Sequence, residues 1–388
     1  MRLGFLLSGL LGLTAAASAA DRPAFWNWSA HPPLGWNAVD AYGASVTPAE
    51  VLTNAHYLHD KLLSQGWNLI VVDAPWTAVG SADWPKVATE LHQLGLKLGV
   101  RMRGTPDEKA TLPTDQAGYD AMVQKYAAGG VDLLEADVAA EPDRTAALAA
   151  LRHAIDGCGR PMILSVAPGK TPFDQAAAVA AQANLWRFSD PIWDRWDDLN
   201  RAFDQLATGH ESGGPGHWLD AGLIPLGHVA IRNSSAGPDR PTRLTRDEQL
   251  SLLSLWSLAS SPLILSMNLP DTDEWTQGLL TNHEVLAIDQ DSLGTPARRV
   301  VQKANREVWA KPLADGDLAL GFFNRGDQPI TVVVFWPELG LTGPCWVRDL
   351  WNKEDRAEAD RGLEVDVAPH GAVLLKLHSI AAKPAPAA

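Results

Sequence analysis

The chain has 388 residues, of which 46% are hydrophobic and 20% are charged, and its formal net charge is -14. A chain this apolar can bury a core, which excludes a disordered protein, and its acidic balance disfavours nucleic acid and anionic membranes as partners. The 16 Trp outnumber the 8 Phe and 4 Tyr, which favours a ligand with flat, partly polar faces such as a sugar ring. Two cysteines, Cys158 and Cys345, exclude a disulfide framework or a structural zinc site, and we expect free thiols.

The first twenty residues have the pattern of an export signal. Arg2 is followed by an apolar run at 3–13, and Ala17-Ser18-Ala19 fits an A-x-A cleavage site. The apolar run is too short to span a bilayer. We therefore expect residues 1–20 to be a cleaved signal peptide and the mature protein to be secreted or periplasmic.

Short apolar segments then alternate with helical patterns. The segments expected as strands are 34–36, 68–73, 97–102, 131–137, 161–166, 184–188, 218–220 and 261–267. The segments expected as helices are 47–63, 84–94, 115–128, 144–157, 174–182 and 245–260. Apolar strands that alternate with helices indicate a parallel sheet covered on both faces. Eight such units at this length predict a (β/α)₈ TIM barrel.

From about residue 300 the pattern becomes β-rich. Expected strands at 308–309, 318–323, 331–335 and 372–377 are separated by polar turns, which predicts a small antiparallel sandwich or barrel. The fold class is therefore α/β, a TIM barrel followed by a C-terminal antiparallel β-sandwich. The expected boundaries are 21–298 for the barrel, 299–380 for the β domain and 381–388 for a disordered tail.

Polar residues cluster at the predicted strand ends, where TIM barrels carry their chemistry. They are Asp73, Arg101, Arg103, Asp137, Arg187, Asp190, Asp220 and Ser266. Several carboxylates that converge on one barrel mouth favour a catalytic site over separate helix caps or structural ion pairs. Nucleotide-binding, metal-binding and serine-nucleophile motifs are absent from the sequence, so we expect no cofactor and no metal. Glycoside hydrolysis needs only two carboxyl groups, and Trp rings would line its pocket.

A series of sequence motifs in a characteristic order along the chain supports this interpretation. The run from Pro32 to Asn37 is similar to a P-P-M-G-W-N opening, the run from Val131 to Asp137 to V-D-x-x-K-x-D, and the run from Gly216 to Asp220 to G-x-W-x-D. Further similar motifs, in chain order, lie at 71–73, 95–99, 102–106, 184–187, 193–196, 226–227, 260–263 and 281–291. Together they resemble glycoside hydrolase family 27, the α-galactosidase family, from about residue 31 to the start of the β domain.

The resemblance implies an enzyme that cleaves terminal α-linked galactose-type sugars by a retaining double displacement. Asp137 takes the place of the nucleophile, and Asp73 takes the place of an Asp that binds sugar hydroxyls. Arg187 is expected to bind a hydroxyl and to lower the pKa of a nearby carboxylate. The other expected substrate-binding residues are Trp76, Arg103, Glu135 and Asp220. The implied partner is a small-molecule or oligosaccharide substrate, without nucleic acid or a membrane.

The chain also departs from the family pattern. A second Asp on the second strand is replaced by Ala74, and a Lys two residues before the nucleophile is replaced by Glu135. The position of the acid/base Asp is occupied by Pro191, with Asp190 one residue early. Since residues two apart on a strand share a face, Glu135 reverses a charge beside Asp137.

These departures leave alternatives open. Asp190 acts as the acid after a local backbone change, Asp194 or Asp220 replaces it, or the protein acts on another glycoside or only binds sugar. Arg101 and Arg103 either compensate for Glu135 or bind an acidic sugar. The rings expected near the pocket are Trp36, Trp76, Trp186, Trp193, Trp196 and Trp218. The rings expected to pack in the β domain are Trp309, Trp336, Trp346 and Trp351.

Overall fold

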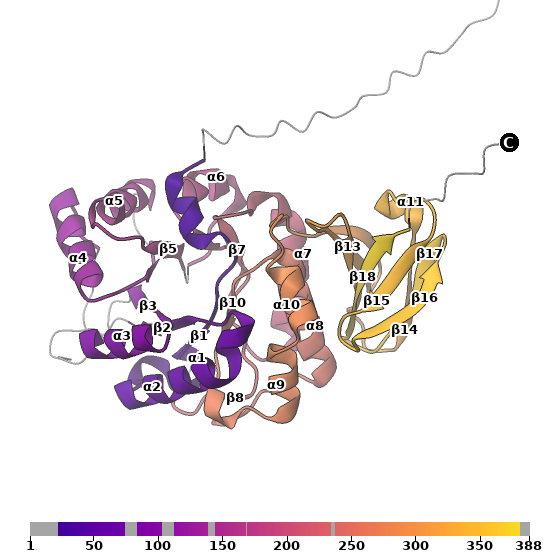
Figure 1. Ribbon diagram of the computed structural model, residues 1–388, viewed down its shortest axis with the longest axis horizontal. Coiled ribbons are helices and arrows are strands. Elements are labelled where there is room, and N and C mark those ends of the chain that lie inside the picture. The colour runs from indigo at the N-terminus through magenta and orange to yellow at the C-terminus, as the bar shows by residue number, and fades with distance from the viewer. Residues whose placement is uncertain are drawn as a thin grey trace, which may run out of the picture.

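A computed structural model describes residues 22–73, 84–102, 112–138, 144–167, 169–233 and 237–380. Figure 1 shows helices arranged around a parallel sheet, and a smaller group of antiparallel strands that lies beyond α7 and α8. The signal-peptide and tail predictions fall outside the described residues. Within the described ranges, no helix combines the length and the apolar character that crossing a bilayer requires.

The first sheet has eight parallel strands in the order β10-β1-β2-β3-β4-β5-β6-β7. They are β1 Leu34–Asn37, β2 Leu69–Asp73, β3 Lys97–Met102, β4 Leu133–Ala136, β5 Ile163–Val166, β6 Leu185–Arg187, β7 Trp218–Asp220 and β10 Leu263–Leu265. Ile224 follows β7 along the chain and pairs with β10 at the opposite edge of the sheet. Its N–H donates to Ile264 O (2.9 Å), and its carbonyl accepts from Ser266 N (3.0 Å). The sheet therefore curls back on itself, and the predicted TIM barrel is confirmed.

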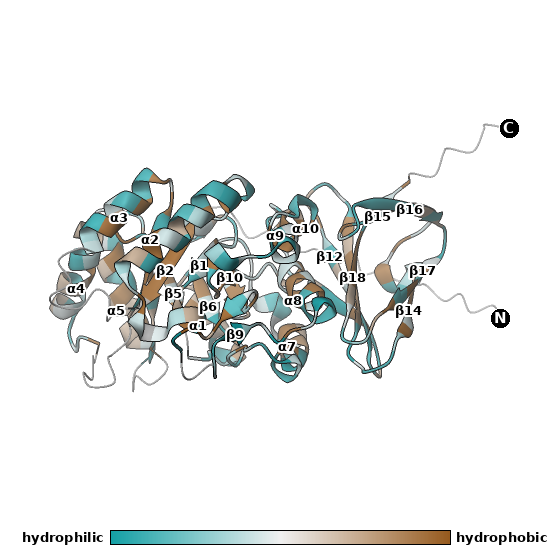
Figure 2. Ribbon diagram, turned by 90° about the horizontal axis from the view of Figure 1, so that it is seen from below, coloured by the Kyte–Doolittle hydropathy of each residue, from teal (hydrophilic) through white to brown (hydrophobic). Residues whose placement is uncertain are grey.

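Helices cover the outside of this sheet. They are α1 Val39–Tyr42, α2 Pro48–Tyr57, α3 Trp84–Gln93, α4 Gln116–Ala128, α5 Arg144–Gly157, α6 Ala176–Ala180, α7 Trp196–Gly209, α8 Arg246–Ala259, α9 Glu274–Leu280 and α10 His283–Asp289. A short hairpin, β8 His228–Val229 with β9 Arg240–Pro241, lies between β7 and α8. In Figure 2 the strands β2 and β5 are largely brown, whereas the covering helices carry both teal and brown. This pattern is expected of amphipathic helices that bury one face against a sheet.

The barrel interior has an apolar layer of its own. It is made of Leu69, Val71, Leu133, Ile163, Leu185, Trp218 and Ile264. The indole N–H of Trp218 donates to Ser29 O (2.8 Å) of the 3₁₀ helix Ala24–Ser29. This N-terminal segment therefore contacts the end of the barrel where the strands begin.

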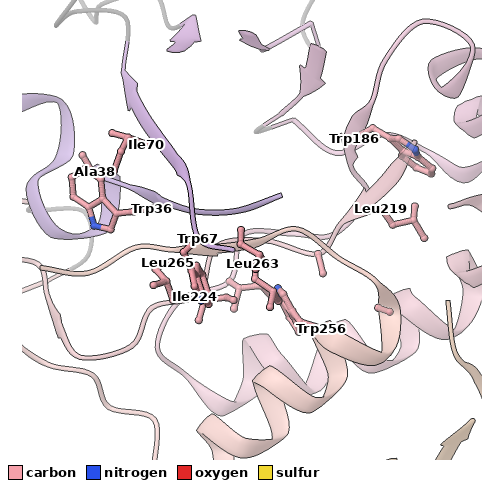
Figure 3. Packing of buried hydrophobic residues seen from close by; sticks show 14 of the residues in the cluster. Trp36, Ala38, Trp67, Ile70, Trp186, Leu219, Ile224, Trp256, Leu263 and Leu265 are labelled. Carbon is pink, nitrogen blue, oxygen red and sulfur yellow. The ribbon is translucent and has the colours of Figure 1, made fainter. Parts of the chain in front are cut away.

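Three Trp rings that were expected around the pocket are buried instead. Trp36 and Trp186 are fully buried and Trp218 is 1% exposed. Trp36 donates its indole N–H to Met267 O (2.6 Å) and packs in the layer between strands and helices (Figure 3). The expectation that these rings line the pocket is wrong, because Trp36 and Trp186 point out of the barrel and Trp218 lies in its apolar inner layer.

The C-terminal domain is an antiparallel β-sandwich. Its strands are β11 Arg298–Lys303, β12 Arg306–Pro312, β13 Leu318–Asn324, β14 Ile330–Phe335, β15 Cys345–Asp349, β16 Glu354–Ala359, β17 Gly362–Val367 and β18 Ala372–Ser379, with a short helix α11 Trp336–Leu339. A six-stranded sheet, β11-β12-β13-β18-β15-β16, faces the β14–β17 pair. Trp309 and Trp336 pack inside as expected, whereas Trp346 is 53% exposed and its predicted packing role is wrong. Cys158 and Cys345 are both free thiols, as expected.

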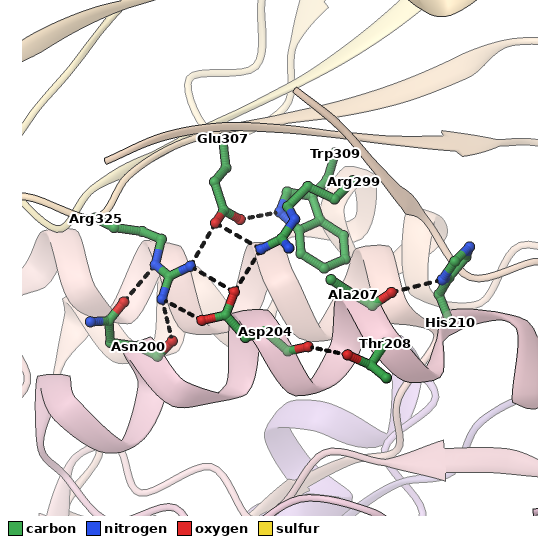
Figure 4. Close-up of polar contacts among 9 residues, drawn as sticks. All are labelled: Asn200, Asp204, Ala207, Thr208, His210, Arg299, Glu307, Trp309 and Arg325. Carbon is green, nitrogen blue, oxygen red and sulfur yellow. Dashed lines mark hydrogen bonds and ion pairs between the residues drawn. The ribbon is translucent and has the colours of Figure 1, made fainter. Parts of the chain in front are cut away.

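Polar contacts join the two domains (Figure 4). Glu307 of β12 is fully buried, and its carboxylate accepts from Arg299 Nη1 (3.0 Å), Arg325 Nη1 (2.6 Å) and the Trp309 indole (2.9 Å). Both arginines also bind Asp204 of α7. These charges therefore link a barrel helix to the sandwich through a network of ion pairs around the buried Glu307.

Candidate active site

The strands carry polar residues directly above the apolar layer of the barrel. Two residues after Leu133, Ile163, Leu185 and Trp218 the chain places Glu135, Ser165, Arg187 and Asp220, and alternation keeps each pair on one face of its strand. We use the name polar ring for Asn37, Arg101, Glu135, Ser165, Arg187 and Asp220, which are all buried. The polar ring forms the floor of the barrel mouth at the carboxyl ends of the strands.

An ion pair between neighbouring strands fills one side of the polar ring. Arg101 of β3 lies beside Glu135 of β4 in the register, and Arg101 Nε binds Glu135 Oε1. Their side chains are 3% and 11% exposed. Of the two explanations for Arg101, the geometry favours compensation for Glu135. Arg103 lies outside the described residues.

A second ion pair occupies the other side of the polar ring. Arg187 of β6 donates from Nε to Asp220 Oδ2 of β7 (3.0 Å), and Asp220 Oδ1 accepts from Gly222 N (2.9 Å). With Arg101 and Glu135, the polar ring holds two cations and two anions. The floor of the mouth is therefore balanced in charge and held by hydrogen bonds.

Asp137 stands above this floor. It follows β4 and lies two residues beyond Glu135, so continued alternation carries it to the mouth side of the barrel. Asp137 is exposed, in contrast to the buried polar ring. Its charge partly opposes the lowering that burial imposes on the pKa of Arg144 at the start of α5. Asp137 is thus a solvent-exposed residue on the mouth side of the barrel.

Asp190 follows β6, and its carboxylate contacts residues on the outer side of the barrel. Gln205 Nε2 of α7 donates to Asp190 Oδ2 (2.8 Å), and Lys170 Nζ lies 3.5 Å from Asp190 Oδ1. The Asp190 side chain is 47% exposed. Its contacts in the described part of the chain run to the outer helix and to the loop after β5.

Known proteins similar to this chain share this architecture. Residues 79–291 match the family model described as alpha galactosidase A, and residues 303–377 match the alpha galactosidase C-terminal beta sandwich domain. The chain belongs to glycoside hydrolase family 27. A solved family 27 β-L-arabinopyranosidase from Geobacillus stearothermophilus is 34% identical, with a TM-score of 0.86 over 92% of this chain and 99% of that one.

Curated relatives support the same family at lower identity. Alpha-galactosidase A of Cellvibrio japonicus is 26% identical, over 97% of this chain and 99% of its own length. A probable alpha-galactosidase of Dictyostelium discoideum is also 26% identical, over 89% of this chain and 92% of its own. As a member of family 27 with both domains, the protein is a glycoside hydrolase.

Asp194 has a structural role in this family 27 enzyme. It is 1% exposed, and it accepts from Arg240 Nη2 (2.6 Å), Arg240 Nε (3.0 Å) and Arg243 N (3.0 Å). Both oxygens are engaged with the segment around β9. Asp194 therefore fixes the loop after β6 and is not placed to meet a substrate.

Asp40 is a buried carboxyl that sequence reasoning missed. It lies in α1, directly after β1, where its N–H donates to Ser266 Oγ (3.0 Å). Burial raises the pKa of Asp40 to about 7, and a hydrogen bond from Ser266 and the charges of Arg101 and Arg187 oppose the rise. The sequence does place Asp40 three residues after the first strand, close to the barrel mouth. Its burial, however, could not be predicted from this spacing.

Other predicted site residues are only partly described. Asp73 ends β2, and its backbone lies beside Arg101 in the register. Trp76, Arg103 and Ala74 lie outside the described residues, as does the side chain of Asp73.

Two further rings that were expected near the mouth differ in their surroundings. Trp196 stacks on His370 of the sandwich, with ring centres 4.1 Å apart and planes at 9°, so it contacts the β domain rather than lining the mouth. Trp193 is half-buried against the main core. Among the described residues, no group of three or more His, Cys, Asp or Glu is arranged to hold a metal.

Proposed function

We propose that this family 27 enzyme removes terminal α-linked galactose-type sugars by a retaining double displacement with Asp137 as the nucleophile. The observation that carries the proposal is the position of Asp137, which is exposed after β4 and above the buried, charge-balanced polar ring. Family membership supports a glycosidic substrate. In such a site an exposed carboxylate above the polar ring can attack the anomeric carbon of a bound sugar.

The reaction requires a second carboxyl group, and we assign this role to Asp190. In the first step Asp137 bonds to the anomeric carbon while Asp190 donates its proton to the departing glycosidic oxygen. In the second step Asp190 takes a proton from water, which attacks the same carbon and releases Asp137. The two carboxyls of a retaining enzyme lie about 5–5.5 Å apart. The half-exposed Asp190 side chain is free to exchange Gln205 for the substrate.

Substrate binding is proposed for the polar residues around this pair. Arg187, Asp220 and Glu135 form part of the floor, where their mutual ion pairs hold them in fixed directions. Asp73, Trp76 and Arg103 are assigned to the sugar by the family resemblance. Asp194 is not assigned a part in the chemistry, because its oxygens are buried and engaged.

A second candidate substrate is a β-L-arabinopyranoside. The 34% identical neighbour is such an arabinopyranosidase, and another solved structure of that enzyme is a complex with arabinose. L-Arabinopyranose presents the same ring hydroxyls as galactose but has no hydroxymethyl group. Ala74 removes a carboxylate that the family pattern places after Asp73, which favours a sugar with one polar group fewer.

A kinetic comparison tests both proposals. The purified protein is assayed with 4-nitrophenyl α-D-galactopyranoside and 4-nitrophenyl β-L-arabinopyranoside, and the ratio of the kcat/KM values identifies the preferred sugar. Asp137→Asn should lower kcat by at least about 1,000-fold on either substrate. Asp120→Asn, on the exposed face of α4, is the matched control and should retain wild-type activity. Sugar binding without turnover by the wild type would instead indicate a binding protein.

Export is a separate proposal. It is supported by the charge, apolar run and A-x-A pattern of the first twenty residues. The N-terminal sequence of the protein recovered outside the cytoplasm of its native host should begin at about residue 20 or 21. An uncleaved N-terminus on protein confined to the cytoplasm would contradict export.

A further inference from the structure

A groove outside the barrel mouth runs between α8, α9 and the sandwich loop that follows β15. Its volume is about 700 Å³, and its lining includes Arg246, Trp275, Gly278, Trp351 and Lys353. A second hollow of about 470 Å³ adjoins it and shares Arg246 and Trp275. Binding sites for small ligands have volumes of about 300–1,000 Å³. We use the name rim groove for the two hollows together.

Two indole rings are anchored in the rim groove by their polar edges. The N–H of Trp275 donates to Gln249 Oε1 (3.0 Å), and the N–H of Trp351 donates to Ser254 Oγ (2.8 Å). Both acceptors belong to α8. Each ring is half-buried, so its N–H faces the helix while part of its surface remains accessible in the groove. Fixed, flat and partly exposed rings are suited to stacking against a ligand.

Exposed charged groups border the rings, and their charges balance in the larger hollow, while in the smaller one Asp271 is paired with His228. Arg246 and Lys353 are matched by Asp273 and Glu274, which line the same groove. The guanidinium of Arg246 lies 4.7 Å from the centre of the Trp275 ring. Balanced donors and acceptors beside apolar rings disfavour a strongly charged ligand. They suit a neutral one that has hydroxyl groups and flat apolar faces, as a sugar chain has.

The rim groove opens toward the side of the barrel that carries the mouth. α9 follows β10, so Trp275 in its first turn lies near the carboxyl ends of the strands. Arg246 begins α8, which leads into the amino end of β10, so it lies on the same side. A chain that extends from the mouth across the barrel rim can therefore reach this surface.

We propose that the rim groove is an accessory site for a neutral oligosaccharide chain, distinct from the mouth where Asp137 lies. Trp275 and Trp351 stack against sugar rings, and the flanking charged groups bind hydroxyls. The site adds affinity for polymeric substrates without taking part in bond cleavage. The ligand class follows from the lining of the groove and does not depend on which sugar the mouth cleaves.

Binding to soluble galactomannan, measured by affinity electrophoresis and by isothermal titration, tests this proposal. The variants Trp275→Ala and Trp351→Ala are compared with Trp346→Ala, which removes an exposed ring elsewhere on the sandwich. All are made in an Asp137→Asn background so that the polymer is not cleaved. We expect Kd to rise at least tenfold for the two groove variants and to stay unchanged for the control. In the active background, kcat/KM on the aryl glycoside should stay within twofold of wild type.

A variant that fills the groove tests the proposal even if removing a Trp ring disrupts the fold at the contact between the barrel and the sandwich. A side chain at Gly278 would meet open space, since a Cβ built there has no neighbour within 4 Å. Gly278→Gln should therefore fold and obstruct the groove, weakening polymer binding. Unchanged binding in Gly278→Gln and in both ring variants would overturn the proposal. If the wild type did not bind polymer but sedimented as a dimer, and Trp351→Ala converted it to a monomer, the groove would instead be an interface with a second copy of this chain.

Discussion

Removal of one partner from the Arg101–Glu135 ion pair should strongly destabilise the barrel. The two side chains are 3% and 11% exposed, so neither charge is solvated once its partner is lost. Breaking a buried pair in this way costs about 3–5 kcal/mol, whereas replacing both partners by apolar residues is often neutral. Arg101→Met and Glu135→Leu should each lower the free energy of unfolding by about 3 kcal/mol or more. The double variant should recover most of that loss.

Urea denaturation at pH 7, followed by far-UV circular dichroism, measures these four proteins as a double-mutant cycle. Arg232→Met is the matched control, because Arg232 and Glu50 form an ion pair whose side chains are 38% and 27% exposed. Exposed pairs contribute about 0–1 kcal/mol. Compensation between these residues would be refuted if Arg101→Met lowered the free energy of unfolding by less than about 1 kcal/mol. It would also be refuted if the double variant were no more stable than the less stable of the two single variants.

Two further predictions concern other buried charges. Burial raises the pKa of Asp40 from 3.8 to about 7, so the folded state retains a proton that the unfolded state releases, and stability should fall as the pH rises from about 4 to about 7. Asp40→Asn should flatten this dependence in melting curves, and an unchanged slope would contradict the assignment. Glu307→Gln should cost about 3 kcal/mol in urea denaturation, because it removes the buried negative charge that Arg299 and Arg325 share and replaces one acceptor oxygen by a donor. A loss no larger than that of an exposed pair would show that the domain junction does not depend on Glu307.

Much of the barrel could be predicted from the sequence because its strands are short, apolar and followed by polar residues. Period-two alternation also places Glu135 over Leu133 and Arg187 over Leu185 without a structure. The pairing of Arg101 with Glu135 could not be predicted in the same way, since it depends on the register between β3 and β4. Local spacing carries no information about such cross-strand partners.

Helix α7 was not predicted, although its buried residues have helical spacing. Leu199, Ala202, Phe203 and Leu206 form one apolar face, but the preceding Trp- and Asp-rich segment obscures where the helix begins. Its Asp198 accepts from Trp193 N (3.1 Å), outside the helix. The contact between Asp190 and Gln205 depends on this helix, which is why the outward direction of Asp190 could not be anticipated.

The Trp excess indicated a sugar ligand, but the structure divides these residues differently. Trp36, Trp186 and Trp218 are core residues that fill space with large rings. Trp36 and Trp218 also donate an indole hydrogen bond to a backbone carbonyl. Trp275 and Trp351 are the rings with accessible surface in a groove. Neither was expected near a ligand, because the rim groove is formed by segments far apart in the sequence.

Asp137 should become covalently bonded to the sugar during turnover, and trapping this intermediate tests its role as nucleophile most directly. The protein is incubated with a fluorinated galactosyl or arabinopyranosyl fluoride that forms a slowly hydrolysed glycosyl-enzyme, and its peptic peptides are analysed by mass spectrometry. We predict one added glycosyl group on the peptide that contains Asp137, and no label in Asp137→Asn. A label on a different carboxylate, or turnover that inverts the anomeric centre without any labelled peptide, would contradict the account.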